Sequence, residues 1–519
     1  MNLTAELPVR QISSMNTSNS NNYLQSDAKI VDHSKLIGDN IHKSIRVHPS
    51  ILKIIQTPEF QRLHNIKQLG LCFYVFPCAK HSRFEHSLGA YYLACQLVNN
   101  IRKKYPDREY KIDELGITTK LTDDVALCIL IAAVCHDIGH GPYSHNFDDV
   151  LLRDSNHPNR THEVRSCLLT ETICRRELGL DDPHIAFTKS VMNPDHNNPS
   201  HKGALYQIVS NELNGMDVDK YDYLNRDSYN LRLNKEFDPT RLLEEFIIDS
   251  NGNIAYSKHC SQDVLEMFDT RYKMFSIVYC HKTNKLIEEM YNDIMIKVDP
   301  IFKISESIND MNRFYKVTDS TVFDLIDNVL NPMPYMKFEF NEEQMTAIRK
   351  AAVIKHRILR RDLYKSIFHQ NDVDEKQVET FIETVLTKIP ELTKADFKIK
   401  RNRIGYVSGN KPDPFMSIYF YDKNNDTQTF ILDKTRISGL KNSSYRETKY
   451  ILILKRSEYC EQVRQLWKDY YKVIVDMRSV IDKQHETDAQ LVRQISEPAS
   501  GWVRMAHVES TIWAINDKK

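Results

Sequence analysis

The most informative stretch of the chain is VALCILIAAVCHDIGHGPYSHNFDD, residues 125–149. Its first half is an apolar run of about three helical turns, which predicts a buried helix. A buried helix ordinarily ends in a capping residue and a polar turn. This one ends instead in side chains that bind metals and transfer protons, namely His136, Asp137, His140, His145 and Asp148.

Further groups of the same kind stand elsewhere: His86 lies in HSRFEHSLGA, and Asp219 lies in NGMDVDKYDY. Two histidines and two aspartates from separate helices are enough to hold a divalent metal against a phosphate. Each residue alone would more often be a buried, hydrogen-bonded side chain, but their concentration favours a metal site. Mixed nitrogen and oxygen ligands suit Mn, Fe, Mg or Zn, and the sequence leaves that choice open.

The helix is expected to end near Asp137, because Gly139 and Gly141 interrupt the helical pattern. The glycines would then turn His140 toward the same cleft. Tyr223 and Asp227 follow later in the chain at helical spacing from the aspartate of NGMDVDKYDY, which suits a sugar-contacting face, although tyrosine at such spacing is more often part of a core.

Basic side chains accompany the metal-binding groups. Arg83 precedes His86 by one helical turn, so the two side chains can face one cleft. Lys220 follows Asp219 directly, and Arg271 opens the pattern RYKMFSIVY. A metal flanked by Arg and Lys provides the charge neutralisation that a polyphosphate needs.

The bulk composition bounds the class of protein. The chain has 519 residues, 70 Lys and Arg, 70 Asp and Glu, and ten scattered cysteines without a CxxC pair. Zero net charge gives no global attraction to nucleic acid or membranes, and the cysteines are expected to be reduced thiols. The longest apolar run, Val125–Cys135, is too short to cross a bilayer. We therefore expect a soluble intracellular protein without membrane attachment.

The pattern along the chain predicts four parts. Residues 1–34 are rich in Ser and Asn and predict a disordered leader. Residues 35–391 predict a mainly helical domain, with helices over Asp123–His136, Lys202–Leu213 and Val264–Lys297 among others. Residues 392–483 predict an α+β lobe, because FKIKRNRIGYV, MSIYFYD, TQTFIL and KYILILK are typical of strands. Residues 484–519 form a tail of unknown role.

Four motifs together resemble one family: TPEFQRLHNIKQLGLCFYVFPCAKHSRFEHSLGAYYLACQLV, CHDIGHGPYSHNFDD, THEV and NGMDVDKYDYLNRDS. They are similar to the SAM- and HD-domain-containing deoxynucleoside triphosphate triphosphohydrolases of the HD superfamily. The likeness runs from about Lys35 to about Tyr470, and no SAM domain is expected in the short segment before it. The resemblance implies a mainly α fold, with an HD-domain helical core and a smaller C-terminal α+β appendage.

The resemblance also implies roles for individual residues. The metal ligands would be His86, His136, Asp137 and Asp219. The catalytic groups would be His162 with Glu163 beside it, His140 and His145 at the phosphates, and Asp148 orienting a histidine. The triphosphate would be held by Arg83, Lys220 and Arg271. Gln68 and Asp227 would bind the 3′-hydroxyl, Leu69 would pack on the base, and Tyr223 and Tyr279 would reject a 2′-hydroxyl.

The implied reaction is the hydrolysis of a dNTP to a deoxynucleoside and tripolyphosphate by a homo-oligomer, a dimer or a tetramer, which would lower dNTP pools. Phe275 and Cys280 replace the family's phosphate-side histidine and base-side glutamine, which puts the rate in question. Gln56 and His64 replace an Asp and an Arg that read a guanine-nucleotide activator, although Lys35 matches. Residues of a second activator site also look replaced, near Ser257, His259 and Asp263. We expect no strict GTP activation, so that the enzyme would be constitutive or respond to another nucleotide.

Two alternatives remain. The chain could be another HD phosphohydrolase that acts on nucleoside monophosphates or signalling nucleotides. It could also be a catalytically weak nucleic-acid-binding protein, with the basic segments KIKRNR (398–403) and HRILRR (356–361) touching phosphates. We expect both basic segments to be solvated surface faces and not nucleic-acid-binding sites. The basic side chains near the expected metal favour a triphosphate over the other phosphate substrates.

Overall fold

The computed structural model describes residues 34–152, 156–195, 197–233, 237–406, 412–433 and 445–476. The described part is mainly helical with small sheets, which confirms the predicted fold class. The predicted disordered leader, apart from Ser34, and the whole tail of residues 484–519 lie outside the described residues.

The chain divides into two compact units, Met1–Leu363 with Asn402–Thr448, and Tyr364–Arg401 with Lys449–Lys519. The sequence analysis placed the boundary between the helical domain and the α+β lobe after residue 391, which lies inside the second unit. Pairing between distant strands explains the difference. Strand β9 (Tyr419–Asp422) pairs in parallel with β6 (Ile254–Ser257), which returns this segment of the expected appendage to the first unit.

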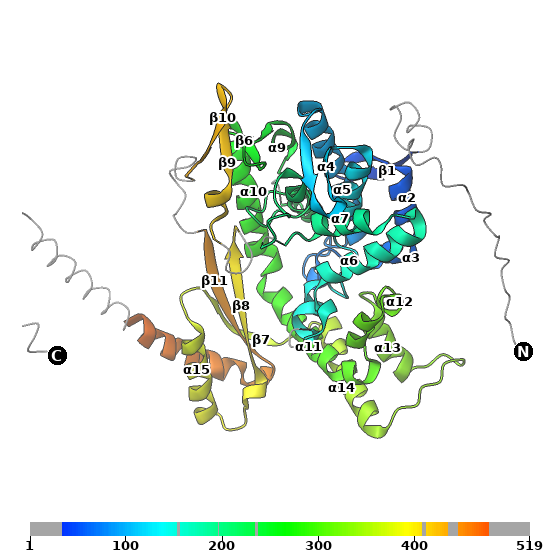
Figure 1. Cartoon of the computed structure of the whole chain (residues 1–519). Helices are drawn as coiled ribbons and strands as arrows, with labels where there is room; N and C mark the ends of the chain where they lie inside the picture. Colours follow the sequence, from blue (N-terminus) through cyan, green and yellow to red (C-terminus); the bar gives the residue numbers. More distant parts are fainter. Residues whose placement is uncertain are drawn as a thin grey trace, which may run out of the picture. The chain divides into compact units, whose positions relative to one another are not determined.

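Four helices form the centre of the first unit (Figure 1). Helix α5 (Asp123–Cys135) packs against both α4 (Arg83–Lys104) and α7 (Asp182–Met192), and α4 also contacts α8 (Val218–Leu231). The Thr122 side chain caps α5 by accepting from the Val125 N–H. Because α5 is apolar nearly all round, its burial between neighbours is what fixes the position of its C-terminal end.

The other helices extend this bundle within the first unit. They are α2 (Pro49–Ile55), α3 (Pro58–Gln61), α6 (His162–Ile173), α9 (Thr240–Glu244), α10 (Ser261–Met274), α11 (Lys282–Phe302), α12 (Met311–Phe314), α13 (Thr321–Leu330) and α14 (Glu342–Leu359). Two hairpins precede α5 in sequence, β1 (Lys35–Asp39) with β2 (Lys43–Val47), and β3 (Glu109–Ile112) with β4 (Ile117–Lys120).

The small sheet of the first unit has the order β10-β9-β6-β5, with β5 at Phe246–Ile248 and β10 at Asn425–Ile431. A tight turn joins β9 to β10, because Asp422 of β9 pairs directly with Asn425 of β10. The strands β7 (Lys365–Gln370), β11 (Arg446–Leu454) and β8 (Phe397–Gly405) form a sheet in the order β7-β11-β8, and all of β7 and most of the other two strands belong to the second unit. Helix α15 (Glu375–Lys388) shares a core with that sheet, centred on Trp467, which stacks on Phe368.

Two predicted helices are wrong in extent. Residues 202–213 form only the 3-10 turn Ala204–Gln207, since Gly203 enters it with a φ of 96° that no helix contains. The predicted helix over Val264–Lys297 continues from α10 as a π-helix, Phe275–Tyr279, breaks at Cys280 and His281, and restarts at Lys282 with His281 as its N-cap. The apolar periodicity on both sides of this break concealed it.

None of the helices in the described ranges is long and apolar enough to cross a membrane. All ten cysteines are free thiols, in agreement with the expectation of reduced cysteines.

Gly89 of α4 provides a test of the packing between α4 and α8. A Cβ at this position would lie 1.8 Å from Oδ1 of Asp222 and 2.5 Å from Nη2 of Arg226. Gly89→Ala should therefore lower the free energy of unfolding by roughly 1–3 kcal/mol through overpacking, although alanine gains up to about 1 kcal/mol in helix propensity. Urea unfolding measures the change, with Gly38→Ala as control because no atom lies within 4 Å of its added methyl. Equal or greater stability of the Gly89 variant would contradict this packing.

Candidate active site

The structure brings the four expected metal ligands together at the meeting point of α4, α5 and α8. His86 comes from α4, His136 and Asp137 from the end of α5, and Asp219 from the first turn of α8. The His86 Nε2 atom lies 3.1 Å from His136 Nε2, 3.1 Å from Asp219 Oδ1 and 3.5 Å from Asp137 Oδ2. His136 Nε2 lies 3.5 Å from Asp219 Oδ1 and 3.6 Å from Asp137 Oδ1.

The hydrogen bonds of the two histidines leave this cluster suited to a cation. Nδ1 of His136 lies 2.8 Å from the Ala133 carbonyl and Nδ1 of His86 lies 2.8 Å from the Asp222 carboxylate, so both Nδ1 atoms carry the proton. Both Nε2 atoms then present lone pairs toward each other and toward two carboxylates. A divalent metal with ligands at about 2.1 Å has adjacent ligand atoms about 3 Å apart, which these separations match. The residues therefore fit a divalent metal.

A proton and a metal would compete for the Nε2 atom of His86. Burial opposes a charge on His86, but the hydrogen bonds to Asp219 and Asp222 outweigh it and raise the pKa of His86 to about 10. The concentration of negative charge that raises this pKa is the same property that attracts a metal cation.

Asp222 supports the cluster from behind. Its fully buried carboxylate accepts from His42 Nε2 at 2.7 Å and from Arg226 Nε at 2.8 Å, in addition to its bond with His86. Burial alone would raise the pKa of Asp222, but the Arg226 charge and these hydrogen bonds hold it well below its usual range. Arg226 in turn binds Asp39 at the β1–β2 turn at 2.8 Å. The carboxylate thus fixes both the tautomer and the orientation of His86.

The turn after α5 is held by two buried arginines. The Arg62 guanidinium donates to the carbonyls of His140, at 2.6 Å, and Val317, at 2.8 Å, while Arg165 Nε donates to the Gly139 carbonyl at 2.9 Å. A Cβ on Gly139 would lie 2.3 Å from both the His162 carbonyl and the Ser166 N–H nitrogen. Only glycine allows α6 to approach this closely and bring His162 to the metal site.

The following residues, Tyr143 and Ser144, have φ values of 53° and 60°. Side chains in this left-handed region cost roughly 1–2 kcal/mol per residue. The buried Asp319 carboxylate holds the turn by accepting from the Tyr143 N–H at 2.7 Å and the Lys67 N–H at 2.9 Å. Arg83 Nε adds a bond to Ser144 Oγ at 2.9 Å. The strained turn is thereby tied to the segment that carries Gln68.

Three histidines gather beside the metal ligands. The His140 ring stacks on His162 with centroids 3.8 Å apart, and the exposed His145 ring lies 5.2 Å from His140. His162 Nδ1 lies 3.1 Å from Asp148 and its Nε2 lies 3.3 Å from Glu163. Burial, with the charges of Arg83 and His162, holds the pKa of His140 well below its usual range. Asp137 connects the two groups, since its Oδ1 lies 3.2 Å from His140 Nε2.

Each basic residue expected at the triphosphate contacts a protein partner. Arg83 binds Asp137, and Lys220 Nζ lies 3.0 Å from the buried Asp217. The Arg271 guanidinium stacks over Phe275 at 4.1 Å and donates to the Gly405 carbonyl. These contacts keep all three cations positioned within the first unit.

The residues expected at the sugar form a second group around the buried Asp227. The Tyr279 hydroxyl donates to Asp227 Oδ2 at 2.5 Å, and the His81 Nε2 atom lies 2.7 Å from Asp227 Oδ1. The Gln68 N–H donates to the His81 carbonyl at 3.0 Å. Tyr223 lies between the two groups on α8, with its ring 6.4 Å from the His86 ring, and burial raises the pKa of its phenol. Leu69, half-buried, begins the 3-10 turn Gly70–Tyr74 beside Gln68.

Sequence reasoning missed the supporting groups. Asp222 stands one helical turn after Asp219 in the same motif, so helical spacing could have revealed it. His42, Asp39, Arg62 and Asp319 come from distant segments, and no local pattern marks them. His81 stands close to Arg83 and His86 in the motif and could have been suspected.

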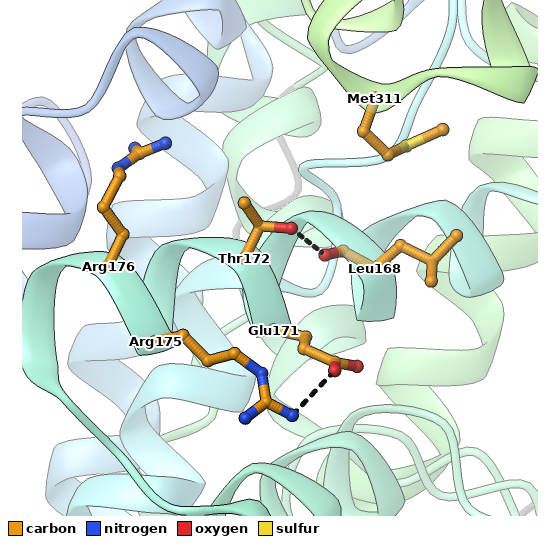
Figure 2. Close-up of a pocket in the computed structure, with 6 residues that line it drawn as sticks. All are labelled: Leu168, Glu171, Thr172, Arg175, Arg176 and Met311. Carbon is orange, nitrogen blue, oxygen red and sulfur yellow. Dashed lines mark hydrogen bonds and ion pairs between the residues drawn. The ribbon is translucent and has the colours of Figure 1, made fainter.

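A separate open pocket of about 580 Å³ lies on the surface of α6 and faces Met311 of α12 (Figure 2). Its two arginines are engaged by carboxylates: Arg175 binds Glu171 and Asp182, and Arg176 binds Glu59. The expected metal, catalytic and substrate residues do not line it. We therefore take the His/Asp cluster, and not this pocket, as the candidate active site.

Replacing Asp222 tests its role in metal binding. Asp222→Asn should weaken the affinity for a divalent metal by about 10–100-fold, because His86 loses the partner that fixes its tautomer. Isothermal titration of the metal-stripped protein with Mn²⁺ measures this change. Asp123→Asn, which alters an exposed ion pair with Arg102, is the matched control and should bind normally. Unchanged affinity in the Asp222 variant would show that this carboxylate does not act on the metal.

Comparison with known proteins agrees with this geometry. Residues 83–219 match the HD domain family, a range that begins before His86 and ends at Asp219. The chain is 49% identical over 448 residues to the putative HD domain-containing protein L394 of Acanthamoeba polyphaga mimivirus, covering 85% of this chain and 97% of that protein. It is 31% identical to the deoxynucleoside triphosphate triphosphohydrolase SAMHD1 homolog of Dictyostelium discoideum, covering 85% and 81% of the two chains. It is likewise 31% identical to human SAMHD1, over 82% and 71%. The chain therefore belongs to the family of HD-domain phosphohydrolases that includes the SAMHD1 deoxynucleoside triphosphate triphosphohydrolases.

Proposed function

We propose that this protein hydrolyses deoxynucleoside triphosphates to deoxynucleosides and tripolyphosphate. The observation that carries the proposal is the arrangement of the four-ligand cluster, which lies directly beside the histidines of the HD turn and α6. The relatives named as triphosphohydrolases support the same reaction.

A divalent metal bound by His86, His136, Asp137 and Asp219 would supply Lewis-acid neutralisation of the phosphate and a more acidic water. The cluster does not select among Mn, Fe, Mg and Zn, and elemental analysis of the purified protein would identify the native metal. Lys220 and Arg271 add positive charge that favours a triphosphate over a monophosphate.

The histidines provide proton transfer. His162 is oriented by Asp148 at Nδ1, which directs its Nε2 outward toward Glu163. In this role His162 holds the proton that the departing 5′-oxygen requires. The neutral His140, which stacks on His162, and the exposed His145 would contact the phosphates.

The buried group around Asp227 would bind the sugar. Asp219, Tyr223 and Asp227 recur every four residues on α8, so Asp227 lies about 12 Å along the helix from the metal ligand. A substrate with its phosphates at the metal would extend its sugar toward Tyr223, Tyr279 and Asp227. The two tyrosines fill the space that a 2′-hydroxyl would need, while Gln68 and Asp227 bind the 3′-hydroxyl and Leu69 packs on the base.

Phe275 and Cys280 distinguish this site from the family pattern. Phe275 covers the Arg271 guanidinium and packs edge-on against Tyr279, with ring centroids 4.8 Å apart. It therefore replaces a proton-bearing group by an apolar cover that keeps both neighbours in place. A slower reaction with an intact metal site is the expected consequence.

The residues at the expected activator position predict that the protein responds to a nucleotide other than GTP, or to none. His64 is exposed and stacks on Phe84 with centroids 3.7 Å apart, and Gln56 is an exposed residue at the end of α2. Neither side chain offers the carboxylate or the guanidinium fork that reads guanine in a bidentate manner. A homo-oligomer, either a dimer or a tetramer, remains a prediction from the resemblance, and sedimentation analysis of the purified protein tests it.

The central prediction concerns activity. Wild-type protein with Mn²⁺ or Mg²⁺ should release tripolyphosphate from dNTPs and not from the matching rNTPs. The double variant His136→Ala/Asp137→Ala should lose at least about 1,000-fold of this activity, because half of the metal ligands are removed. Chromatographic detection of tripolyphosphate measures the product directly. Arg175→Ala in the surface pocket of Figure 2 is the control and should retain activity.

Release of phosphate from nucleoside monophosphates or signalling nucleotides, with dNTPs untouched, would replace this proposal by the other HD phosphohydrolase function. Salt-dependent binding of single-stranded nucleic acid without any hydrolysis would favour the nucleic-acid-binding alternative.

The effector prediction is tested by adding GTP to the same assay. We expect the rate of dATP hydrolysis to change less than about twofold between zero and millimolar GTP, since the guanine-reading side chains are replaced. A silent protein that requires GTP would contradict this expectation. The double variant Gln56→Asp/His64→Arg should gain GTP dependence if these positions form the activator site.

A further inference from the structure

His81 is a buried residue to which neither the sequence nor the family resemblance gave a role. It stands two residues before Arg83, at the entrance to α4, and its side chain is 1% exposed. Its Nε2 atom lies 2.7 Å from Asp227 Oδ1, while the Tyr279 hydroxyl donates to Asp227 Oδ2 at 2.5 Å. The carboxylate is therefore held from both sides by groups on two different segments.

The partner of His81 determines its hydrogen-bonding roles. A carboxylate that accepts from Tyr279 is an acceptor toward His81 as well, so Nε2 of His81 carries a proton. In the neutral ring, Nδ1 is then an acceptor, and it is buried without a hydrogen-bond partner in the part of the chain that the structure describes. Leaving a buried polar atom unpaired costs about 1–3 kcal/mol.

Gln68, on the adjoining backbone segment, also carries a buried acceptor atom without a hydrogen-bond partner among the described residues. Its N–H donates to the His81 carbonyl, and the unpaired atom is its Oε1. An ordinary core histidine paired with a carboxylate would account for the Nε2 contact alone. Two unpaired buried acceptors beside a fixed carboxylate indicate a place for a ligand that donates hydrogen bonds.

The position along α8 identifies the kind of donor. Asp227 lies about 12 Å from Asp219 along the helix, beyond Tyr223 and away from the cations of the phosphate end. When the phosphates of the proposed substrate lie at the expected metal ligands, the part that reaches Asp227 is the sugar, whose hydroxyls are uncharged donors. A sugar hydroxyl fits this chemistry.

We propose that His81 is a specificity-determining residue that orients the Asp227 carboxylate to receive the 3′-hydroxyl of the substrate. This inference rests on the proposed function and adds a residue and a measurable selectivity to it. His81 fixes the Asp227 oxygen that the hydroxyl meets, so its loss should lower discrimination at the 3′ position rather than the metal-dependent step.

The experiment compares kcat/KM for dATP with that for 2′,3′-dideoxyadenosine triphosphate. Wild-type protein should prefer dATP by at least about tenfold, since one unpaired buried group costs about that factor. His81→Leu should reduce this preference to less than about threefold. His81→Gln should retain most of the preference, because the glutamine amide can donate from the position of Nε2.

His201→Leu is the matched control, because His201 pairs with Glu114 at 3.1 Å elsewhere in the same unit and has no contact with the expected site residues. Its preference should equal that of the wild type. If His81 were only structural, His81→Leu would lower kcat/KM for both nucleotides equally and leave their ratio unchanged, which would overturn the proposal. A wild type without preference for the 3′-hydroxyl would overturn it too.

Failure of the proposed function is separable from failure of this inference. If the wild type hydrolyses no dNTP, equilibrium titration still gives the dissociation constants of dATP and its dideoxy analogue. A wild-type preference in binding that His81→Leu removes and His81→Gln keeps would support the role of His81 without hydrolysis. Equal binding of both nucleotides by the wild type, or a preference that persists in His81→Leu, would overturn it.

Discussion

The opposition of two imidazole lone pairs and two carboxylates is the constraint on which the rest of this site depends. His86 and His136 present their Nε2 atoms to each other at 3.1 Å, with Asp137 and Asp219 alongside. Such an arrangement is unfavourable without a cation between the groups, and it persists because helix packing holds each ligand independently. The ends of α4, α5 and α8 must therefore meet at one point, and the apolar α5 fixes where they meet.

Buried charges behind the ligands make that meeting point rigid. Asp222 joins α8 to His86 on α4, to His42 and, through Arg226, to Asp39 of the first hairpin. Each charged side chain in this hydrogen-bonded series has a partner, which is the condition under which buried ions are tolerated. The first hairpin, to which no catalytic role is assigned, thereby contributes to the orientation of His86, an expected metal ligand.

The turn after α5 has a different role: its irregular backbone carries histidines beside the expected metal ligands. Its carbonyls are occupied by Arg62 and Arg165, and its strained Tyr143–Ser144 step is held by Asp319. Strain at a functional site persists only where the surroundings determine the conformation from several directions. Here the restraining contacts come from Arg62 before the motif, Arg165 shortly after it and Asp319 far beyond it in the sequence.

The sequence by itself determined the helical class, and it marked the expected metal ligands and the neighbouring histidines, because these depend on residue type at short spacing and on a specific motif resemblance. It also located the strands of the C-terminal part from their composition. Only the tertiary structure decided that β9 pairs with β6, that α10 breaks before α11, and that residues 202–213 are not a helix. It alone revealed Asp222, Asp319 and His81 as partners of the site. The physical reason is that these contacts join residues far apart in the chain, whose burial and pairing arise from packing and leave no periodic signal in the sequence.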